Sequence, residues 1–350
     1  MEEKMKSKDA NESLVKYGKQ YILDCLANAR QPKIPGIITA QDIPDEMDNL
    51  YDNGIQEGKM LGIKGLDHLL KFEKGRLYIF TANAGTGKST FMNFVISSLY
   101  VKHKWRTLVF SPEKSPVQYH FLELAQLILG RKFRKGNVTI EMKHRIMKYV
   151  SQNFPHVDHT RITDYTDIIG LIRQMKTTAD GVDVLLIDPV NWMTPDNEPG
   201  ATEMQLISAK LKALILSAQQ MDILVLLVAH PKKTDSKTME NLSLSIYDIS
   251  GSADYANKCD VGVVLQRDLK TRLVYVCVQK VRFDHLGQIG RCALSYDKET
   301  GRYSGCKEVR IGMTGDAVQY IPEPFDKTNW IDGKVVQQQM NFEEESDMPF

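Results

Sequence analysis

The chain has 350 residues, of which 42% are hydrophobic and 25% charged, and its formal net charge at pH 7 is +1. This length and composition allow at least one full core, and suggest two domains or one large domain with appendages. A charge this close to zero does not favour a general polyanion binder, so any such site must be a local patch. The longest apolar runs are too short to span a bilayer, and the polar start MEEKMKSKDANE is no secretory signal.

The cysteines show no pattern of a metal or redox site. Their positions contain no CxxC pair and no spacing with histidine that suits zinc. We expect buried thiols in a reducing compartment. The five residues are Cys25, Cys259, Cys277, Cys292 and Cys306.

The first sixty residues differ from the rest in their pattern of polar, apolar, proline and glycine residues. Residues 1–31 indicate a polar start followed by a helix over about 12–30. Residues 32–60 are punctuated by proline and glycine, which predicts a linker around one short helix.

From about Gly62, short apolar runs alternate with helical segments, which predicts an α/β fold with a buried, mostly parallel sheet flanked by helices. The segments 273–280 and 290–297 alternate better and predict an antiparallel hairpin at the C-terminal edge. The pattern fades beyond about Cys306, so we divide the chain at 305 and expect 306–350 to be an extension with an acidic tail. The parallel strands are expected at 76–80, 107–110, 182–187, 223–229 and 261–266.

The stretch ANAGTGKST, residues 82–90, predicts a phosphate-binding loop, because it follows an apolar strand directly and precedes a good helix. Gly85 and Gly87 allow the tight turn that points backbone N–H groups at phosphate oxygens, and the helix start adds its positive end. We expect Lys88 to reach the β- and γ-phosphates and the Ser89 hydroxyl to ligate Mg²⁺. The predicted nucleotide contacts in the loop are Asn83, Ala84, Gly85, Thr86, Gly87, Lys88, Ser89 and Thr90.

Ala82 stands where the usual pattern of such a loop has its first glycine. That glycine begins the loop and does not contact phosphate, so we expect the methyl group to be accommodated. Strain is expected only if Ala82 needs a positive φ.

Two acidic residues follow predicted strands. Asp188 ends the run VDVLLI, where a carboxylate can hold Mg²⁺ and so complete the nucleotide site. Glu113 follows the strand TLVF. We expect that strand to lie beside the phosphate-loop strand, which would aim Glu113 at the γ-phosphate as the base for the attacking water. A solvated loop glutamate is the alternative that the residues leave open.

Together these segments resemble the RecA-like replicative helicases of the DnaB superfamily, especially the helicase half of phage primase–helicases and the mitochondrial Twinkle helicases. The likeness covers roughly residues 8–300. It implies that Glu113 is the catalytic base, that Asp188 belongs to the metal site and that His230 senses the γ-phosphate. The motifs, in chain order, are KGRLYIFTANAGTGKSTF, FSPEKS, LLIDPVNWM, LVAHPKK, DISGSADYANKCDVGVVLQRD and QKVRFDHLGQIG.

The same resemblance implies that Lys280 and Arg282 reach the nucleotide of a neighbouring subunit. The two residues lie two apart on an alternating strand, so both side chains face the same side. An arginine offered in this way stabilises transition-state charge and makes hydrolysis depend on assembly. Without the other motifs, a solvated basic face would be the better interpretation.

DNA contacts are expected from the loop PKKTDSKTMENLS, where Lys232, Lys233 and Lys237 suit backbone phosphates rather than base edges. The acidic segment NWMTPDNEPGATE is a weaker second candidate. Several copies in a ring would pool such loops, which offsets the low net charge of one chain.

The resemblance implies a ring-shaped DNA helicase, hexameric or heptameric, that uses ATP or another NTP with Mg²⁺ and moves 5′ to 3′ on single-stranded DNA in the cytoplasm of a bacterial or phage-infected cell. A recombinase or regulatory ring ATPase without unwinding activity is the main alternative, and a non-catalytic interaction protein is a second. The 32–60 linker is expected to reach a neighbouring subunit.

The two ends suggest replisome partners. The start, KDANESLVKYGKQYILDCLANA, resembles the end of a toprim-type primase domain, whose catalytic acidic residues would lie upstream, so we expect no primer synthesis by this chain. The end, FEEESDMPF, could anchor a polymerase or primase through Pro349 and Phe350, although a solubilising tail has comparable weight.

Overall fold

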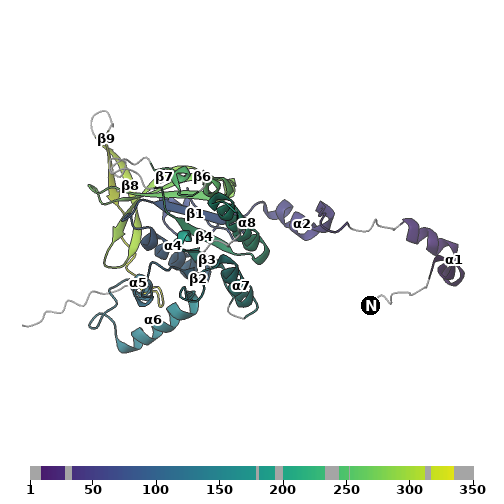
Figure 1. Cartoon of the computed structure of the whole chain (residues 1–350), viewed down its shortest axis with the longest axis horizontal. Coiled ribbons are helices and arrows are strands. Elements are labelled where there is room, and N and C mark those ends of the chain that lie inside the picture. Colours follow the sequence, from purple (N-terminus) through teal and green to yellow (C-terminus); the bar gives the residue numbers. More distant parts are fainter. Residues whose placement is uncertain are drawn as a thin grey trace, which may run out of the picture. The chain divides into compact units, whose positions relative to one another are not determined.

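The computed structural model describes residues 9–27, 34–178, 181–193, 200–232, 244–251, 253–311 and 317–334. It divides into two compact units, residues 1–56 and 57–350 (Figure 1). Within these described ranges, no helix has the length and apolar character needed to cross a membrane.

The first unit consists of helix α1 (Ala10–Ala27), the 3₁₀ helix η1 (Ala40–Asp42) and helix α2 (Pro44–Asn53). Helix α1 corresponds to the helix predicted over 12–30, but Gly18, at φ +83°, interrupts it with a kink. Helix α2 is the short helix predicted in the linker. Pro44 suits its first turn, where the missing N–H has no helical partner anyway.

In the second unit, the described strands form one nine-stranded sheet in the order β2-β3-β4-β1-β5-β6-β7-β8-β9. The pairs from β2 through β5 are parallel, and those from β5 through β9 are antiparallel. This confirms the prediction of a mostly parallel sheet with an antiparallel edge. The strands are β1 (Leu77–Ala82), β2 (Thr107–Phe110), β3 (Val184–Ile187), β4 (Leu224–Ala229), β5 (Val261–Arg267), β6 (Val274–Val281), β7 (Gly290–Asp297), β8 (Arg302–Ile311) and β9 (Ala317–Pro322).

Helices cover both faces of the sheet (Figure 1). Successive residues of each strand point to opposite faces, so alternate side chains pack against different helices. In β1, Tyr78 and Phe80 pack with α4, α5 and α6, whereas Leu77 and Ile79 pack with α7, α8 and α9. The helices of this unit are α3 (Lys64–Asp67), α4 (Lys88–His103), α5 (Gln118–Leu129), α6 (Ile140–Asn153), α7 (Tyr165–Lys176), α8 (Glu203–Met221) and α9 (Asp254–Lys258).

Two expectations for the chain need correction. The sheet continues beyond Cys306, because β8 crosses the boundary set at 305 and β9 follows it. The cysteines are free but not uniformly buried. Cys259 and Cys277 are buried, Cys292 and Cys306 are partly buried, and Cys25 is exposed.

The C-terminal part of the second unit is held to α5 by Arg302, which is only 1% exposed. Its Nε and Nη2 donate to the carbonyls of Leu127 (2.9 Å) and Ile128 (3.1 Å), in the last turn of α5, where carbonyls have no helical partner. Its Nη1 donates to the Asp326 carbonyl (2.8 Å), and the guanidinium lies 4.0 Å from the centre of the Trp330 ring. A buried cation with satisfied donors therefore joins β8, α5 and the segment 326–330.

We expect Arg302→Met to lower the free energy of unfolding by about 3 kcal/mol, because it removes the buried hydrogen bonds of the guanidinium and leaves the Leu127 carbonyl without a donor. The matched control is Lys132→Met. The Lys132 side chain is 38% exposed and 4.0 Å from Glu299, so its loss should cost no more than about 0.5 kcal/mol. Urea denaturation of both variants measures the difference, and equal midpoints would contradict this role for Arg302.

Candidate active site

The phosphate loop, residues 83–87, joins β1 to α4. Ala82 is the last residue of β1, fully buried and in ordinary extended backbone, so the missing first glycine causes no strain. Gly85 and Gly87 have φ of +75° and +99°, a region that other residues rarely adopt. The loop glycines are therefore required where they occur, and the alanine is tolerated where it occurs.

The remaining predicted contacts surround this turn. Asn83 and Ala84 lie in the loop, the Thr86 N–H donates to the Asn83 carbonyl (3.4 Å), and Ser89 and Thr90 lie in the first turn of α4. Glycine at the N-cap leaves the first N–H groups of α4 without a side-chain partner. Such a helix start attracts anions.

Lys88 folds back over the loop. Its Nζ donates to the carbonyls of Ala82 (2.9 Å) and Asn83 (3.3 Å). Burial lowers the pKa of Lys88, while the nearby carboxylates of Asp188 and Glu113 raise it. The ammonium group thus lies between the phosphate loop and two acidic side chains.

Asp188 follows β3 and is 4% exposed. Burial raises the pKa of its carboxyl, and a hydrogen bond with the Ser89 side chain opposes that shift. A hydroxyl and a carboxylate side by side are hard oxygen ligands of the kind that Mg²⁺ prefers. No larger cluster of acidic, histidine or cysteine ligands occurs among the described residues. The pair fits a magnesium ion that takes its other ligands from water and phosphate.

Glu113 and His230 come from loops after two different strands, β2 and β4, and meet at the same edge. The His230 Nε2 lies 3.3 Å from the Glu113 Oε1, and both side chains are partly exposed. The prediction that β2 lies beside β1 is wrong, because β3 and β4 separate them. Glu113 nevertheless lies near the phosphate loop, because its charge acts on Lys88 and its carboxylate reaches His230 after β4.

Lys280 lies in β6 and Arg282 directly follows that strand, and both are at the opposite end of the parallel strands from the phosphate loop. The Lys280 Nζ donates to the carbonyls of Ala256 (2.7 Å) and Asn257 (2.8 Å). The Arg282 Nη1 donates to the Asp260 Oδ1 (3.0 Å), and its Nη2 donates to the same Asn257 carbonyl.

The register of the sheet fixes how far these residues are from the loop of their own chain. The backbone of Asp260 bonds to both Leu77 and Arg282, so Arg282 is level with the start of β1. The phosphate loop begins at the other end of β1, ~16 Å further along the strand. Neither basic residue is placed to serve the phosphate loop of its own chain.

Of the predicted DNA-binding lysines, Lys232 is exposed, and its N–H donates to the Asp248 carbonyl (2.7 Å). Lys233 and Lys237 lie outside the described residues, as does most of the segment after Trp192. Their predicted contacts remain predictions.

Two site residues were missed by sequence reasoning. Asp260 holds Arg282, and Lys114, directly after Glu113, donates to both carboxylate oxygens of Glu123 at 2.7 Å. Lys114 could have been singled out as a charge beside the candidate base. Asp260 gave no signal, because its partner lies on a different strand.

Comparison with known proteins identifies the fold and the family. The architecture is that of a RecA-like ATPase domain, and residues 58–305 match the DnaB-like helicase C-terminal domain. The chain therefore belongs to the DnaB-like helicase family. This membership was predicted from the six motifs.

A curated relative and two solved structures are similar to this chain. The Twinkle homolog protein, chloroplastic/mitochondrial, of Arabidopsis thaliana is 29% identical over 313 residues, covering 85% of this chain and 44% of that protein. The chain thus spans less than half of that relative. One solved structure, an isolated ATPase domain, has a TM-score of 0.63 at 16% identity, with 78% of this chain and all of that one covered.

The other structure is of a DnaB-like replicative helicase and its interactions with primase. It has a TM-score of 0.58 at 16% identity and covers 84% of this chain and 71% of that one. At this identity both structures support the fold alone.

We expect Ala82→Gly to leave nucleotide affinity unchanged within about twofold, because Ala82 needs no special backbone conformation. Gly87→Ala should weaken binding by about tenfold, because a side chain at this left-handed φ costs about 1–2 kcal/mol. Titration with a fluorescent nucleotide and Mg²⁺ measures both. Tighter binding by Ala82→Gly would mean that the alanine limits the loop.

Proposed function

We propose that the chain is a ring-forming DNA helicase that couples NTP hydrolysis between subunits to 5′ to 3′ movement on single-stranded DNA and to duplex unwinding. One observation carries the proposal. The side chains of a phosphate site gather at one edge of the sheet, whereas Lys280 and Arg282 lie at the other. A site divided in this way supports completion by a second copy.

Within one subunit, the roles follow from position. Lys88 and the N–H groups of the loop bind the phosphates, and Ser89 and Asp188 hold the metal ion. Bound Mg²⁺ would neutralise phosphate charge. Glu113 orients the attacking water and takes its proton, and the adjacent His230 lies where it can respond to the γ-phosphate.

The neighbouring subunit supplies Arg282 and Lys280. Within a single chain the Arg282 guanidinium is paired with Asp260 and is 43% exposed. It must exchange that carboxylate for the γ-phosphate of the next subunit, where it stabilises the charge of the transition state. Hydrolysis then requires assembly.

Movement on DNA would begin at His230. The His230 carbonyl accepts a hydrogen bond from Ser250 (3.0 Å), so β4 is tied to the chain on the far side of the 231–243 loop. That loop carries Lys232, Lys233 and Lys237. Changes at the γ-phosphate would move these lysines on the DNA backbone, giving binding that is insensitive to sequence and sensitive to salt.

Assembly would also use helix α2. Its exposed Met47, Leu50 and Tyr51 lie on one face by their helical spacing, and no described residue of the first unit covers them. We assign this face to a groove on a second copy.

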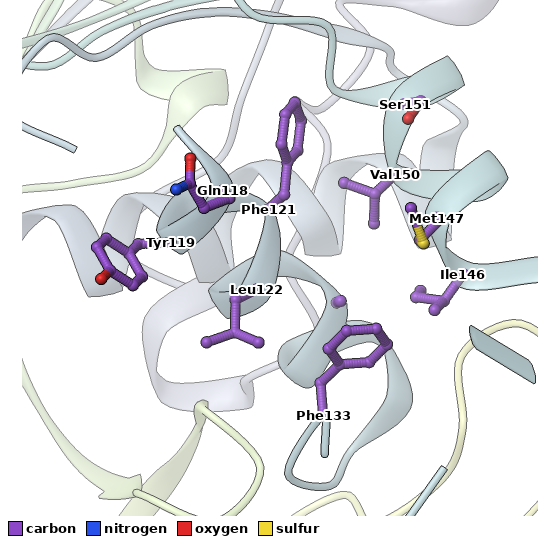
Figure 2. A pocket seen from close by; sticks show the side chains of 10 residues that line it. Gln118, Tyr119, Phe121, Leu122, Phe133, Ile146, Met147, Val150 and Ser151 are labelled. Atoms are coloured by element: carbon purple, nitrogen blue, oxygen red, sulfur yellow. The ribbon is translucent and has the colours of Figure 1, made fainter. Parts of the chain in front are cut away.

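That groove, of about 400 Å³, lies between α5 and α6. Figure 2 shows apolar side chains of α5 along one wall and of α6 along the other, with Phe133 from the intervening loop. A groove of this kind accepts the apolar face of a helix. Its main apolar residues are Phe121, Leu122, Phe133, Ile146, Met147 and Val150.

Charge favours α2 as the occupant. Residues 130–148, which contribute Phe133, Ile146 and Met147 to the groove, contain seven Lys or Arg and one Glu, a net charge of 7 − 1 = +6. Helix α2 contains four Asp or Glu and no Lys or Arg, a net charge of −4. Opposite charges around an apolar contact favour this pairing and its orientation.

The ends of the chain retain their proposed partners. The acidic tail with Pro349 and Phe350 would bind a polymerase or primase, and these residues lie outside the described part of the chain. The start is proposed to be the end of a primase domain.

We expect Lys88→Ala and Arg282→Ala each to lose ~10³-fold or more of DNA-stimulated hydrolysis. Mixing the two variants should restore activity, because about a quarter of randomly formed interfaces then combine an intact Lys88 with an intact Arg282. Hydrolysis and displacement of a strand from 5′- and 3′-tailed forks are measured on the same mixtures.

The matched control mixes Lys88→Ala with Glu113→Gln. Both changes lie on the same side of the interface, so no combination is intact and no activity should return. Absence of recovery in the first mixture would exclude the shared site. Hydrolysis without strand displacement by the unmodified protein would favour the ring ATPase that does not unwind.

We expect Leu50→Glu to raise the concentration needed for assembly by at least about tenfold, because burying a leucine contributes about 1.5–3 kcal/mol. The control, Asn49→Glu, adds the same charge on the opposite face of α2 and should leave assembly unchanged. Sedimentation over a concentration series measures both. Equal effects of the two variants would argue against docking through the apolar face.

A further inference from the structure

A line of polar side chains runs behind the candidate base, mostly through the interior. It begins at Lys114, the residue after Glu113, whose Nζ donates to both oxygens of Glu123 on α5. The Nδ2 of Asn93 donates to the same carboxylate (2.9 Å). Asn93 is 3% exposed and lies one helical turn after Ser89 on α4. Glu123 therefore joins the loop that carries Glu113 to the helix that carries Lys88 and Ser89.

The line continues on the other side of Asn93. Its Oδ1 lies 2.6 Å from the Nε2 of His120, which is 1% exposed. The His120 Nδ1 lies 2.9 Å from the Nε2 of His156, and the His156 Nδ1 lies 2.8 Å from the Phe154 carbonyl. His156 forms a backbone bridge with Val109 of β2. The line thus returns to the strand from which the Glu113 loop departs.

The direction of these hydrogen bonds is set at Glu123. Its carboxylate only accepts, so the Asn93 amide must donate to it and the Asn93 oxygen must accept from His120. The Phe154 carbonyl also only accepts, so the His156 Nδ1 donates to it. In two neutral imidazoles, the bare His120 Nδ1 then faces the bare His156 Nε2, a contact between two acceptors.

Filling every contact would need three protons on the four ring nitrogens, one more than two neutral rings carry. The surroundings oppose that extra proton. Burial lowers the pKa of His120 well below its ordinary value, with the charges of His156 and Lys114 adding to the effect. Burial also lowers the pKa of His156 to about 4. At neutral pH the mismatch therefore remains between the two rings, and the Glu123 end is fully bonded.

We propose that Asn93, His120 and Glu123 are positioning residues for Glu113, forming a directed hydrogen-bond line that holds the Glu113 loop against helix α4. This rests on the proposed function, in which Glu113 is the base. The residue proposed to activate the water, Glu113, and the residue proposed to bind the phosphates, Lys88, lie on separate elements. Glu123 and Asn93 fix the distance between those elements, and His120 fixes the amide orientation of Asn93.

Kinetics of Asn93→Ala, alone and with Glu113→Gln, test the proposal. Asn93→Ala should lower kcat by about tenfold or more, because small misplacements of a catalytic group are costly. KM and nucleotide affinity should stay within about twofold, because Lys88 and Ser89 remain. In the Glu113→Gln background, Asn93→Ala should have no further effect. A further loss there, or a wild-type kcat for Asn93→Ala alone, would overturn the proposal.

Three other variants separate this role from a general loss of structure. Ser97 lies one turn beyond Asn93 on α4, is fully buried, and its hydroxyl has no partner among the described residues, so Ser97→Ala should retain kcat. If Asn93→Ala does not fold, Lys114→Ala at the loop should show the same loss of kcat, and Lys114→Arg should restore it. A wild-type kcat in the Glu113→Gln variant would instead refute the proposed function, because Glu113 would then not be the base that these residues position.

Nitrogen-15 NMR of the histidines gives a readout that a merely structural role would not move. In the unmodified protein His120 should carry the proton on Nε2 and His156 should carry it on Nδ1. Glu123→Gln supplies an amide that can donate to Asn93, which allows the amide of Asn93 to turn and to donate to His120. Both rings should then carry the proton on Nδ1. Unchanged tautomers in the variant would overturn the directed line.

Discussion

The arrangement of the site depends on one constraint, the common direction of the strands from β2 to β5. Parallel strands end at the same edge of a sheet, so the residues that follow them meet there although they are far apart in the sequence. Lys88, Asp188, Glu113 and His230 follow four different strands and reach one another for this reason. Strand β6 is antiparallel to β5, so Lys280 and Arg282, at its C-terminal end, lie beside the start of the parallel strands. Strand direction alone separates the two halves of the candidate site.

Much of this could be predicted from the sequence, because the deciding features are local. A buried parallel strand is a short apolar run, and each predicted run corresponds to a strand within a few residues. The turn at Gly85 and Gly87 follows from the backbone freedom of glycine. The shared side of Lys280 and Arg282 follows from the two-residue period of a strand.

Features that depend on distant pairing could not be predicted. The position of β2 beyond β3 and β4 is decided by how the connecting helices pack. The apolar runs of the sequence indicate strands but not their order in the sheet. Strand β8 was missed because it begins with Arg302, a charged residue whose burial depends on contacts elsewhere in the chain, among them Leu127, Ile128 and Asp326. The line from Lys114 to His156 was missed for the same reason, since its five members are polar residues from four separate parts of the sequence.

The pairing of Arg282 with Asp260 has a consequence for the unassembled protein. The arginine that would serve another subunit is already neutralised inside its own chain, by a carboxylate that is 8% exposed. A lone subunit therefore presents a phosphate loop without the group that completes it. Under the proposed mechanism, free subunits would bind nucleotide without hydrolysing it. Nucleotide would then be consumed only by subunits that have assembled into a ring.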